Sequence, residues 1–133
     1  MGSEMCIRDR GANVTLTGGV ALQTQESWCE FISKDLQSIS FGGNAAELYF
    51  EEDKFDDFLK KLAAIKGIFY VHPVQQYSWG QRVIRFYDPD FHILEVGENM
   101  KSVCRRFLDS GMTIEAAAVR MNVPEKFVRA CVR

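Results

Sequence analysis

Residues 80–98, GQRVIRFYDPDFHILEVGE, carry the pattern that decides the fold. Two runs of alternating side chains flank the Asp-Pro-Asp sequence at residues 88–90, which is typical of a turn. The pattern therefore predicts a β-hairpin. Strand alternation places Glu95 on one face of its second strand and Leu94 and Val96 on the other. A carboxylate between apolar neighbours needs a partner, which is either an arginine in a salt bridge or a bound ligand.

A strand, a helix and a second strand are predicted before the hairpin, in residues 46–53, 55–65 and 67–76. The helix combines one apolar stripe with one charged face, as expected for a helix that covers a sheet. In the first strand, AELYFEED, Leu48 and Phe50 share a face and are expected to pack under that helix.

The DPDFHILEVGE segment resembles the last hairpin of the vicinal oxygen chelate superfamily, which includes glyoxalase I, bleomycin-resistance proteins, fosfomycin-resistance transferases and extradiol dioxygenases. The resemblance covers residues 11–98 and implies an α+β fold of paired βαβββ modules. Residues 46–98 match one module in order. In the first module we recognise the later strands, residues 13–16 and 20–25, so we expect it to be incomplete and the chain to be N-terminally truncated. Residues 1–10 lack periodicity and are interpreted as a non-native or artefactual segment.

The resemblance, together with strand alternation, indicates which side chains face the cavity of such a fold. Glu47 falls where many relatives place a histidine ligand, and Glu95 falls on the glutamate that relatives use as a metal ligand. Tyr49 shares the face of Glu47, and Arg85 lies across the hairpin turn from Glu95. The predicted ligand-binding residues are therefore Glu47, Tyr49, Arg85 and Glu95.

These residues allow two interpretations. If a divalent metal is bound, Glu47 and Glu95 are its ligands; if none is bound, Arg85 pairs with one carboxylate and leaves the other for a cationic or hydroxylated molecule. We favour the pocket without a metal or other cofactor, because the first module offers Gln23 or Gln25 where a metal-binding relative has Glu or His.

Three further expectations concern residues outside this set. His72 is expected on a strand that leads away from the hairpin, and His92 on the face opposite Glu95, so both are interpreted as surface or packing residues. The connector in residues 27–44 is expected to be a short, irregular helix whose Trp28 and Phe31 belong to the core.

Composition limits the classes of protein that remain. The chain of 133 residues is 47% hydrophobic, enough for one packed domain with an appendage, but has no apolar run long enough to span a membrane. Its four cysteines lack metal-site or disulfide-scaffold spacing and are interpreted as reduced thiols. With no signal-peptide pattern at the N-terminus, we expect a cytoplasmic protein.

Residues 99–133 differ in charge from the rest and form a predicted helical tail. They hold 7 basic and 3 acidic side chains, against 9 and 15 in residues 1–98. Three helices are expected, and the last two, around Thr113 and Pro124, resemble a helix-turn-helix. The last helix opens with Glu125 and is only moderately basic, so we expect it not to read duplex DNA.

The sequence thus predicts a glyoxalase/bleomycin-resistance-like protein that binds a small polar organic molecule without a metal. The resemblance also implies a homodimer. One alternative is a metal-dependent lyase, isomerase or dioxygenase of the same superfamily, which would make the protein an enzyme. The other is a DNA-binding regulator whose tail responds to the ligand.

Overall fold

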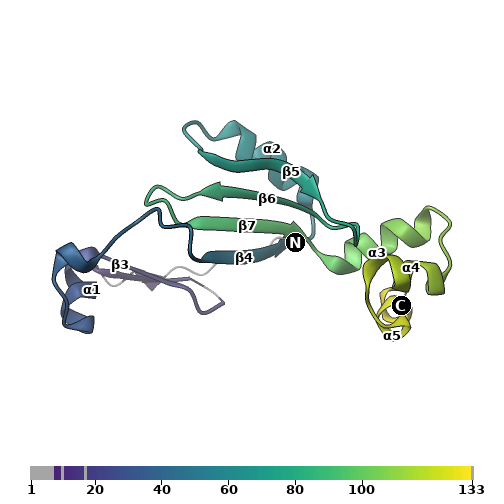
Figure 1. Ribbon diagram of the computed structural model, residues 1–133, viewed down its shortest axis with the longest axis horizontal. Coiled ribbons are helices and arrows are strands. Elements are labelled where there is room, and N and C mark those ends of the chain that lie inside the picture. Colours follow the sequence, from purple (N-terminus) through teal and green to yellow (C-terminus); the bar gives the residue numbers. More distant parts are fainter. Residues whose placement is uncertain (1–7, 10, 17, 133) are drawn as a thin grey trace. The chain divides into compact units, whose positions relative to one another are not determined.

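The computed structural model describes residues 8, 9, 11–16 and 18–132, which fall into two compact units, residues 1–40 and 41–133 (Figure 1). The proposal that residues 1–10 are non-native falls largely outside the described residues. Arg8–Asp9 form strand β1, and the interpretation of this segment stays a prediction.

In the first unit, the described residues form a three-stranded antiparallel sheet in the order β1-β2-β3. β2 (Asn13–Thr15) and β3 (Ala21–Gln23) are joined through Gly18 and Gly19, which both have a positive φ. Helix α1 (Gln25–Ile32) and the short 3₁₀ helix η1 (Leu36–Ser38) follow. These elements confirm the predicted later strands and the irregular helical connector.

The expectation that the connector's aromatic side chains belong to the core is wrong for this unit. Trp28 is 45% exposed and Phe31 is 73% exposed, and none of residues 11–16 and 18–40 is buried. The reason is that one short helix and a narrow sheet do not provide a second layer that could cover these rings.

The second unit contains the complete module predicted from the sequence. β4 (Glu47–Glu52), α2 (Phe55–Ala64), β5 (Tyr70–Gln76), β6 (Arg82–Tyr87) and β7 (Ile93–Glu98) follow one another along the chain. The strands lie in the order β4-β7-β6-β5, with β4 parallel to β7 and the other neighbours antiparallel (Figure 1). This βαβββ topology confirms the α+β fold.

The core of this module lies between α2 and one face of the sheet. Its buried side chains are Phe55 and Leu62 on α2 and Ile84, Phe86 and Val96 on the strands. Along β6 and β7 the buried residues alternate with residues of the opposite sheet face, as strand geometry requires. Phe50 packs against this cluster as expected. Leu48 is not part of this cluster and is 42% exposed on the edge strand β4.

The hairpin turn between β6 and β7 has one unusual residue. Phe91 adopts φ 63°, in the left-handed region that side chains disfavour. Asp88 holds the turn, because its Oδ1 accepts hydrogen bonds from the backbone N–H groups of Asp90 and His92, both at 2.9 Å. The chain therefore retains a tight turn although it lacks glycine at this position.

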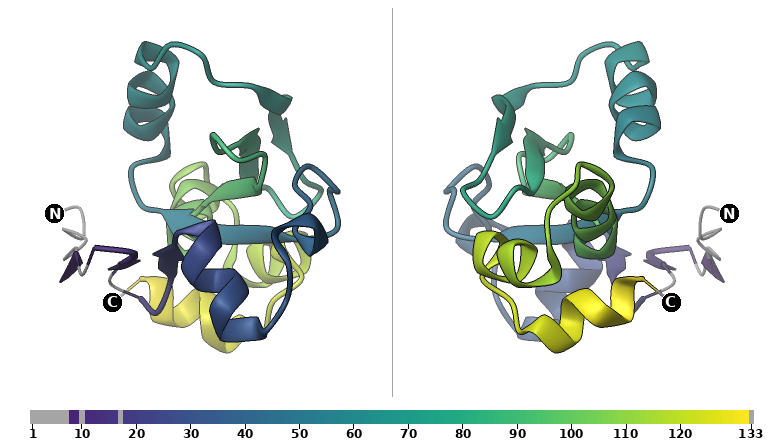
Figure 2. Two further views of the ribbon diagram at one scale, coloured as in Figure 1. Left: turned by 90° about the vertical axis from the view of Figure 1, so that its left-hand side faces the viewer. Right: turned by 90° about the vertical axis from the view of Figure 1, so that its right-hand side faces the viewer.

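The tail folds as the three predicted helices, α3 (Met100–Asp109), α4 (Ile114–Met121) and α5 (Glu125–Cys131). Asn99 and Thr113 cap the first two helices with their side chains, and Asn122 ends α4 in a left-handed conformation. The helices share their own buried cluster: Val103, Cys104, Ala117, Ala118, Met121, Val128 and Cys131. Figure 2 shows α2 (teal) apart from these tail helices (green to yellow). The tail is thus a small helical body with its own core.

Within the described residues, no helix is both long and apolar enough to cross a membrane.

Candidate functional site

The site is organised around the guanidinium group of Arg85 on β6. Its Nε donates to Glu47 Oε2 at 2.8 Å, and its Nη2 donates to Glu95 Oε2 at 2.6 Å. Register explains the convergence: Arg85 faces Glu95 across the β6–β7 pair, and β4, which carries Glu47, is the next neighbour of β7. The structure therefore brings three of the four predicted site residues into one ion-paired cluster.

Two further side chains belong to this cluster and were missed. Arg85 Nη1 donates to the hydroxyl of Tyr77 at 2.7 Å and lies 3.2 Å from His72 Nε2. The expectation that His72 lies on a strand leading away from the hairpin is wrong, because β5 pairs antiparallel with β6 and places His72 opposite Arg85. Extending the hairpin register to a third strand would have found both residues.

His92 and Tyr49 lie beside this cluster rather than in it. His92 is exposed and pairs with Asp88 in the turn, 2.8 Å away, as its predicted surface position implies. Tyr49 is the strand partner of Glu95, and its hydroxyl accepts from Gln81 Nε2 at 2.9 Å and donates to Glu51 Oε1 at 3.1 Å. Gly97 leaves room for the ring, since a Cβ there would lie 3.2 Å from Tyr49 Cε2.

The pKa values of the two carboxyl groups in the cluster are shifted in opposite directions. The Glu95 side chain is 8% exposed, and burial, followed by the nearby Glu47 carboxyl, raises the pKa of Glu95 above its usual range. The hydrogen bond from Arg85 lowers the pKa of Glu47, whose side chain is 35% exposed. With one arginine between two ionised carboxylates the cluster has a formal charge of −1, so it suits a cationic ligand or a hydrogen-bond donor.

These residues do not fit a divalent metal ion. Both carboxylates that a metal would need are already paired with Arg85, whose positive charge lies between them. Among the described residues, the group of three or more His, Cys, Asp or Glu side chains close enough together for an ion is Asp88, Asp90 and His92, whose ligand atoms lie within 4.8 Å of one another. That group lies in the hairpin turn, where Asp88 is occupied by backbone N–H groups.

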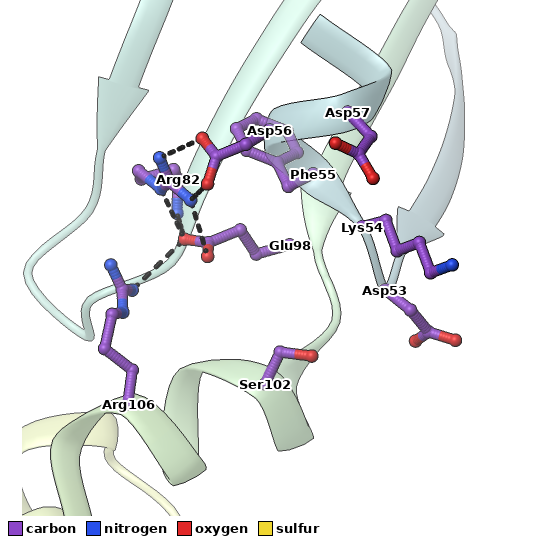
Figure 3. Close-up of a pocket in the computed structure, with 9 residues that line it drawn as sticks. All are labelled: Asp53, Lys54, Phe55, Asp56, Asp57, Arg82, Glu98, Ser102 and Arg106. Carbon is purple, nitrogen blue, oxygen red and sulfur yellow. Dashed lines mark hydrogen bonds and ion pairs between the residues drawn. The ribbon is translucent and has the colours of Figure 1, made fainter. Parts of the chain in front are cut away.

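A second arginine cluster lies on the other face of the same hairpin (Figure 3). Arg82 makes a two-pronged contact with Glu98, from Nε at 3.0 Å and Nη2 at 3.1 Å, and pairs with Asp56 of α2 at 2.9 Å. Arg106 of α3 donates to the same Glu98 at 3.1 Å. A cavity of about 370 Å³ opens beside these groups. Sequence reasoning missed this cluster, although the hairpin register places Arg82 opposite Glu98.

The βαβββ module, with a polar cluster on the sheet face that α2 leaves uncovered, defines a member of the vicinal oxygen chelate superfamily. The comparisons with known proteins agree: the model of the glyoxalase-like domain family matches residues 3–101. The chain therefore belongs to the glyoxalase-like domain family. No curated protein is significantly similar to it.

Solved structures support the same placement. A protein of unknown function from Agrobacterium tumefaciens is 36% identical, with a TM-score of 0.62 over 71% of this chain and 75% of the other. A glyoxalase-related enzyme from Fulvimarina pelagi is 16% identical, with a TM-score of 0.57 over 72% and 71% of the two chains. A glyoxalase/bleomycin resistance protein/dioxygenase family enzyme from Burkholderia phytofirmans is also 16% identical, with a TM-score of 0.58 over 71% and 79%. The last two show the fold alone.

Proposed function

We propose that this protein binds a small polar organic molecule without a metal ion, on the sheet face that carries Glu47, Tyr49, Arg85 and Glu95. The observation that carries the proposal is the position of the Arg85 guanidinium, which bonds both carboxylates at 2.8 and 2.6 Å. The Arg85 guanidinium supplies the positive charge that a metal ion would supply in a metal-dependent relative. It offsets one of the two negative charges and orients both acidic groups, which strand geometry forces together.

The charge of the cluster indicates the class of ligand. Arg85 gives hydrogen bonds to Glu47, Glu95 and Tyr77, which uses most of its donor capacity. The carboxylates and the tyrosine hydroxyl keep acceptor lone pairs. A ligand with amine or hydroxyl donors would therefore bind more tightly than an anion, because an anion would face the formal charge of −1.

The alternative of a metal-dependent lyase, isomerase or dioxygenase is weaker for the same reason. A divalent ion would have to displace Arg85 from both carboxylates and leave a partly buried guanidinium unpaired, at a cost of several kcal/mol. The regulatory alternative is weaker because the tail's last helix opens with an acidic residue, Glu125, which pairs with Arg129 at 3.1 Å.

We also propose that the protein acts as a homodimer. In the first unit, the described side chains Leu22, Trp28, Phe31 and Leu36 are all exposed. In the second unit, β4 is an edge strand of its sheet. Exposed apolar side chains and free strand edges favour association, and a second copy of the chain would cover them. Sedimentation at several concentrations tests this: a dimer supports the proposal, and a stable monomer contradicts it.

The binding proposal is tested by calorimetry on chelator-treated protein with three probes, putrescine, glycerol and succinate. We expect an amine or polyol to bind and succinate not to bind. Glu95→Gln should abolish the binding, whereas Glu115→Gln, an exposed change on α4, should leave it intact. Binding that appears only after a divalent ion is added would overturn the proposal in favour of the metal-dependent alternative.

A further inference from the structure

The β5–β6 turn, residues 77–81, connects the ligand face to the helical tail. On the side of the sheet, the Tyr77 hydroxyl accepts from Arg85 Nη1 at 2.7 Å, and Gln81 Nε2 donates to the Tyr49 hydroxyl at 2.9 Å. Two of the four proposed ligand-binding residues therefore receive a hydrogen-bond partner from this turn.

Hydrogen bonds and a ring contact within the turn link its residues to one another. Tyr77 and Gly80 close it with two backbone hydrogen bonds of 2.9 Å, one between Tyr77 N–H and the Gln81 carbonyl and one between Gly80 N–H and the Tyr77 carbonyl. The Tyr77 ring stacks on Trp79 with centroids 4.4 Å apart, and Trp79 Nε1 donates to Gln81 Oε1 at 3.1 Å. A shift of the turn's backbone would therefore move Tyr77 and Gln81 together.

The tail holds the backbone of this turn from the other side. Arg106 of α3 donates to the Gly80 carbonyl at 2.6 Å, and Arg120 of α4 donates from Nε to the Ser78 carbonyl at 2.8 Å. The Arg120 guanidinium also lies over the Phe107 ring, 5.2 Å from its centroid. Phe107 packs so closely on Gly80 that a Cβ at this position would overlap with the Cζ atom of Phe107.

From these contacts we propose that the helical tail is a positioning element for the ligand site, with Arg120 and Phe107 as its positioning residues and Tyr77 as the group through which they act. The tail fixes the turn, the turn fixes Tyr77, and Tyr77 orients the Arg85 guanidinium between its two carboxylates. The inference rests on the proposed function in treating Arg85 as a ligand-site residue, but the contacts themselves exist without a ligand.

The test is a ¹³C NMR titration of the Glu95 carboxyl in the full chain, which needs no ligand. Arg120→Ala should shift the titration midpoint by about 0.3 pH or more, a twofold change in proton affinity, because a loosened Tyr77 lets Arg85 reorient. Arg120→Lys, which keeps a cationic donor, should restore the midpoint. Arg129→Ala, an exposed tail arginine bonded within α5, is the matched control and should change nothing.

A double-mutant cycle separates positioning from general loosening. In a Tyr77→Phe background, Arg120→Ala should cause no further shift of the Glu95 midpoint, because the group that carries the effect is already gone. An equal shift in both backgrounds, or no shift in a folded Arg120→Ala variant, overturns the inference. If Arg120→Ala does not fold, Phe107→Leu tests the same contact. A ligand-binding failure with these midpoints as predicted would refute only the proposed function.

Discussion

The two arginine clusters of the β6–β7 hairpin use the same pairing and differ in what surrounds it. Arg82 and Arg85 each face a glutamate across the hairpin, Glu98 and Glu95 respectively, and each also pairs with a carboxylate from another element. Because they lie three residues apart on one strand, they point to opposite faces of the sheet. One face is covered by α2 and reached by α3, and the other carries the Arg85 cluster.

The partners show why one cluster is structural and the other is a candidate site. Glu98 accepts from a backbone N–H, from Arg82 and from Arg106, so it joins β6, β7 and α3. Glu95 instead lies among titratable side chains, namely Glu47 on β4 and, through Arg85, Tyr77 and His72. An arginine–glutamate pair in a sequence therefore does not reveal its role. The groups that neighbouring elements add to it decide whether it holds the fold together or binds a ligand.

The largest expected effect comes from breaking the structural cluster. Glu98→Ala leaves Arg82 and Arg106 without their shared acceptor, which we expect to lower the free energy of unfolding by about 3 kcal/mol. Glu125→Ala removes an exposed pair within one helix and should cost less than about 0.5 kcal/mol. Urea denaturation measures both. Equal, small losses would show that the Arg82 cluster is not structural.

The next effect concerns the close approach of the turn and the tail. Gly80 has φ +87° and no room for a Cβ beside Phe107, so Gly80→Ala should cost about 2–4 kcal/mol through strain and overpacking. Gly111 has a similar φ of +99° with nothing within 4 Å of the added atom, so Gly111→Ala reports the strain alone. Similar losses in thermal unfolding of the two variants would contradict the tight packing.

A smaller effect is that the carboxyl groups of Glu95 and Glu47 contribute to stability with opposite dependence on pH. Because the pKa of Glu95 is raised above 4.5 in the folded state, its stabilising contribution is present below that value and is lost as pH rises through the folded pKa. The pKa of Glu47 is lowered, so its contribution is present above 4.5 and is lost as pH falls. The free energy of unfolding of the wild type minus that of Glu95→Gln should therefore fall as the pH rises. The corresponding difference between the wild type and Glu47→Gln should rise with pH. Urea unfolding from about pH 2 to about pH 8 checks these slopes, and slopes of the same sign would refute the assignment.

Sequence reasoning predicted most of the fold because its signals are local. The alternation in residues 80–98, the apolar stripe of α2 and the helix start at Thr113 are each visible within a few residues. Hairpin register also placed Arg85 beside Glu95. These parts of the molecule need no knowledge of distant segments.

The parts that sequence reasoning missed depend on contacts between distant segments. Tyr77 and His72 reach Arg85 only because β5 joins the hairpin as a third strand. Arg106 reaches Gly80 across 26 positions. Trp28 looked like a core residue because it is large and apolar, and what covers such a ring cannot be read from its own segment.

The metal content of the protein tests the central claim most directly, since the claim is that Arg85 takes the place of a metal between Glu47 and Glu95. The full chain is purified without chelators, its metals are measured by mass spectrometry, and Glu47→Gln and Glu95→Gln variants are prepared in parallel. The account predicts far less than one ion per chain and no difference between wild type and variants. A content near one ion per wild-type chain that both substitutions abolish would contradict it.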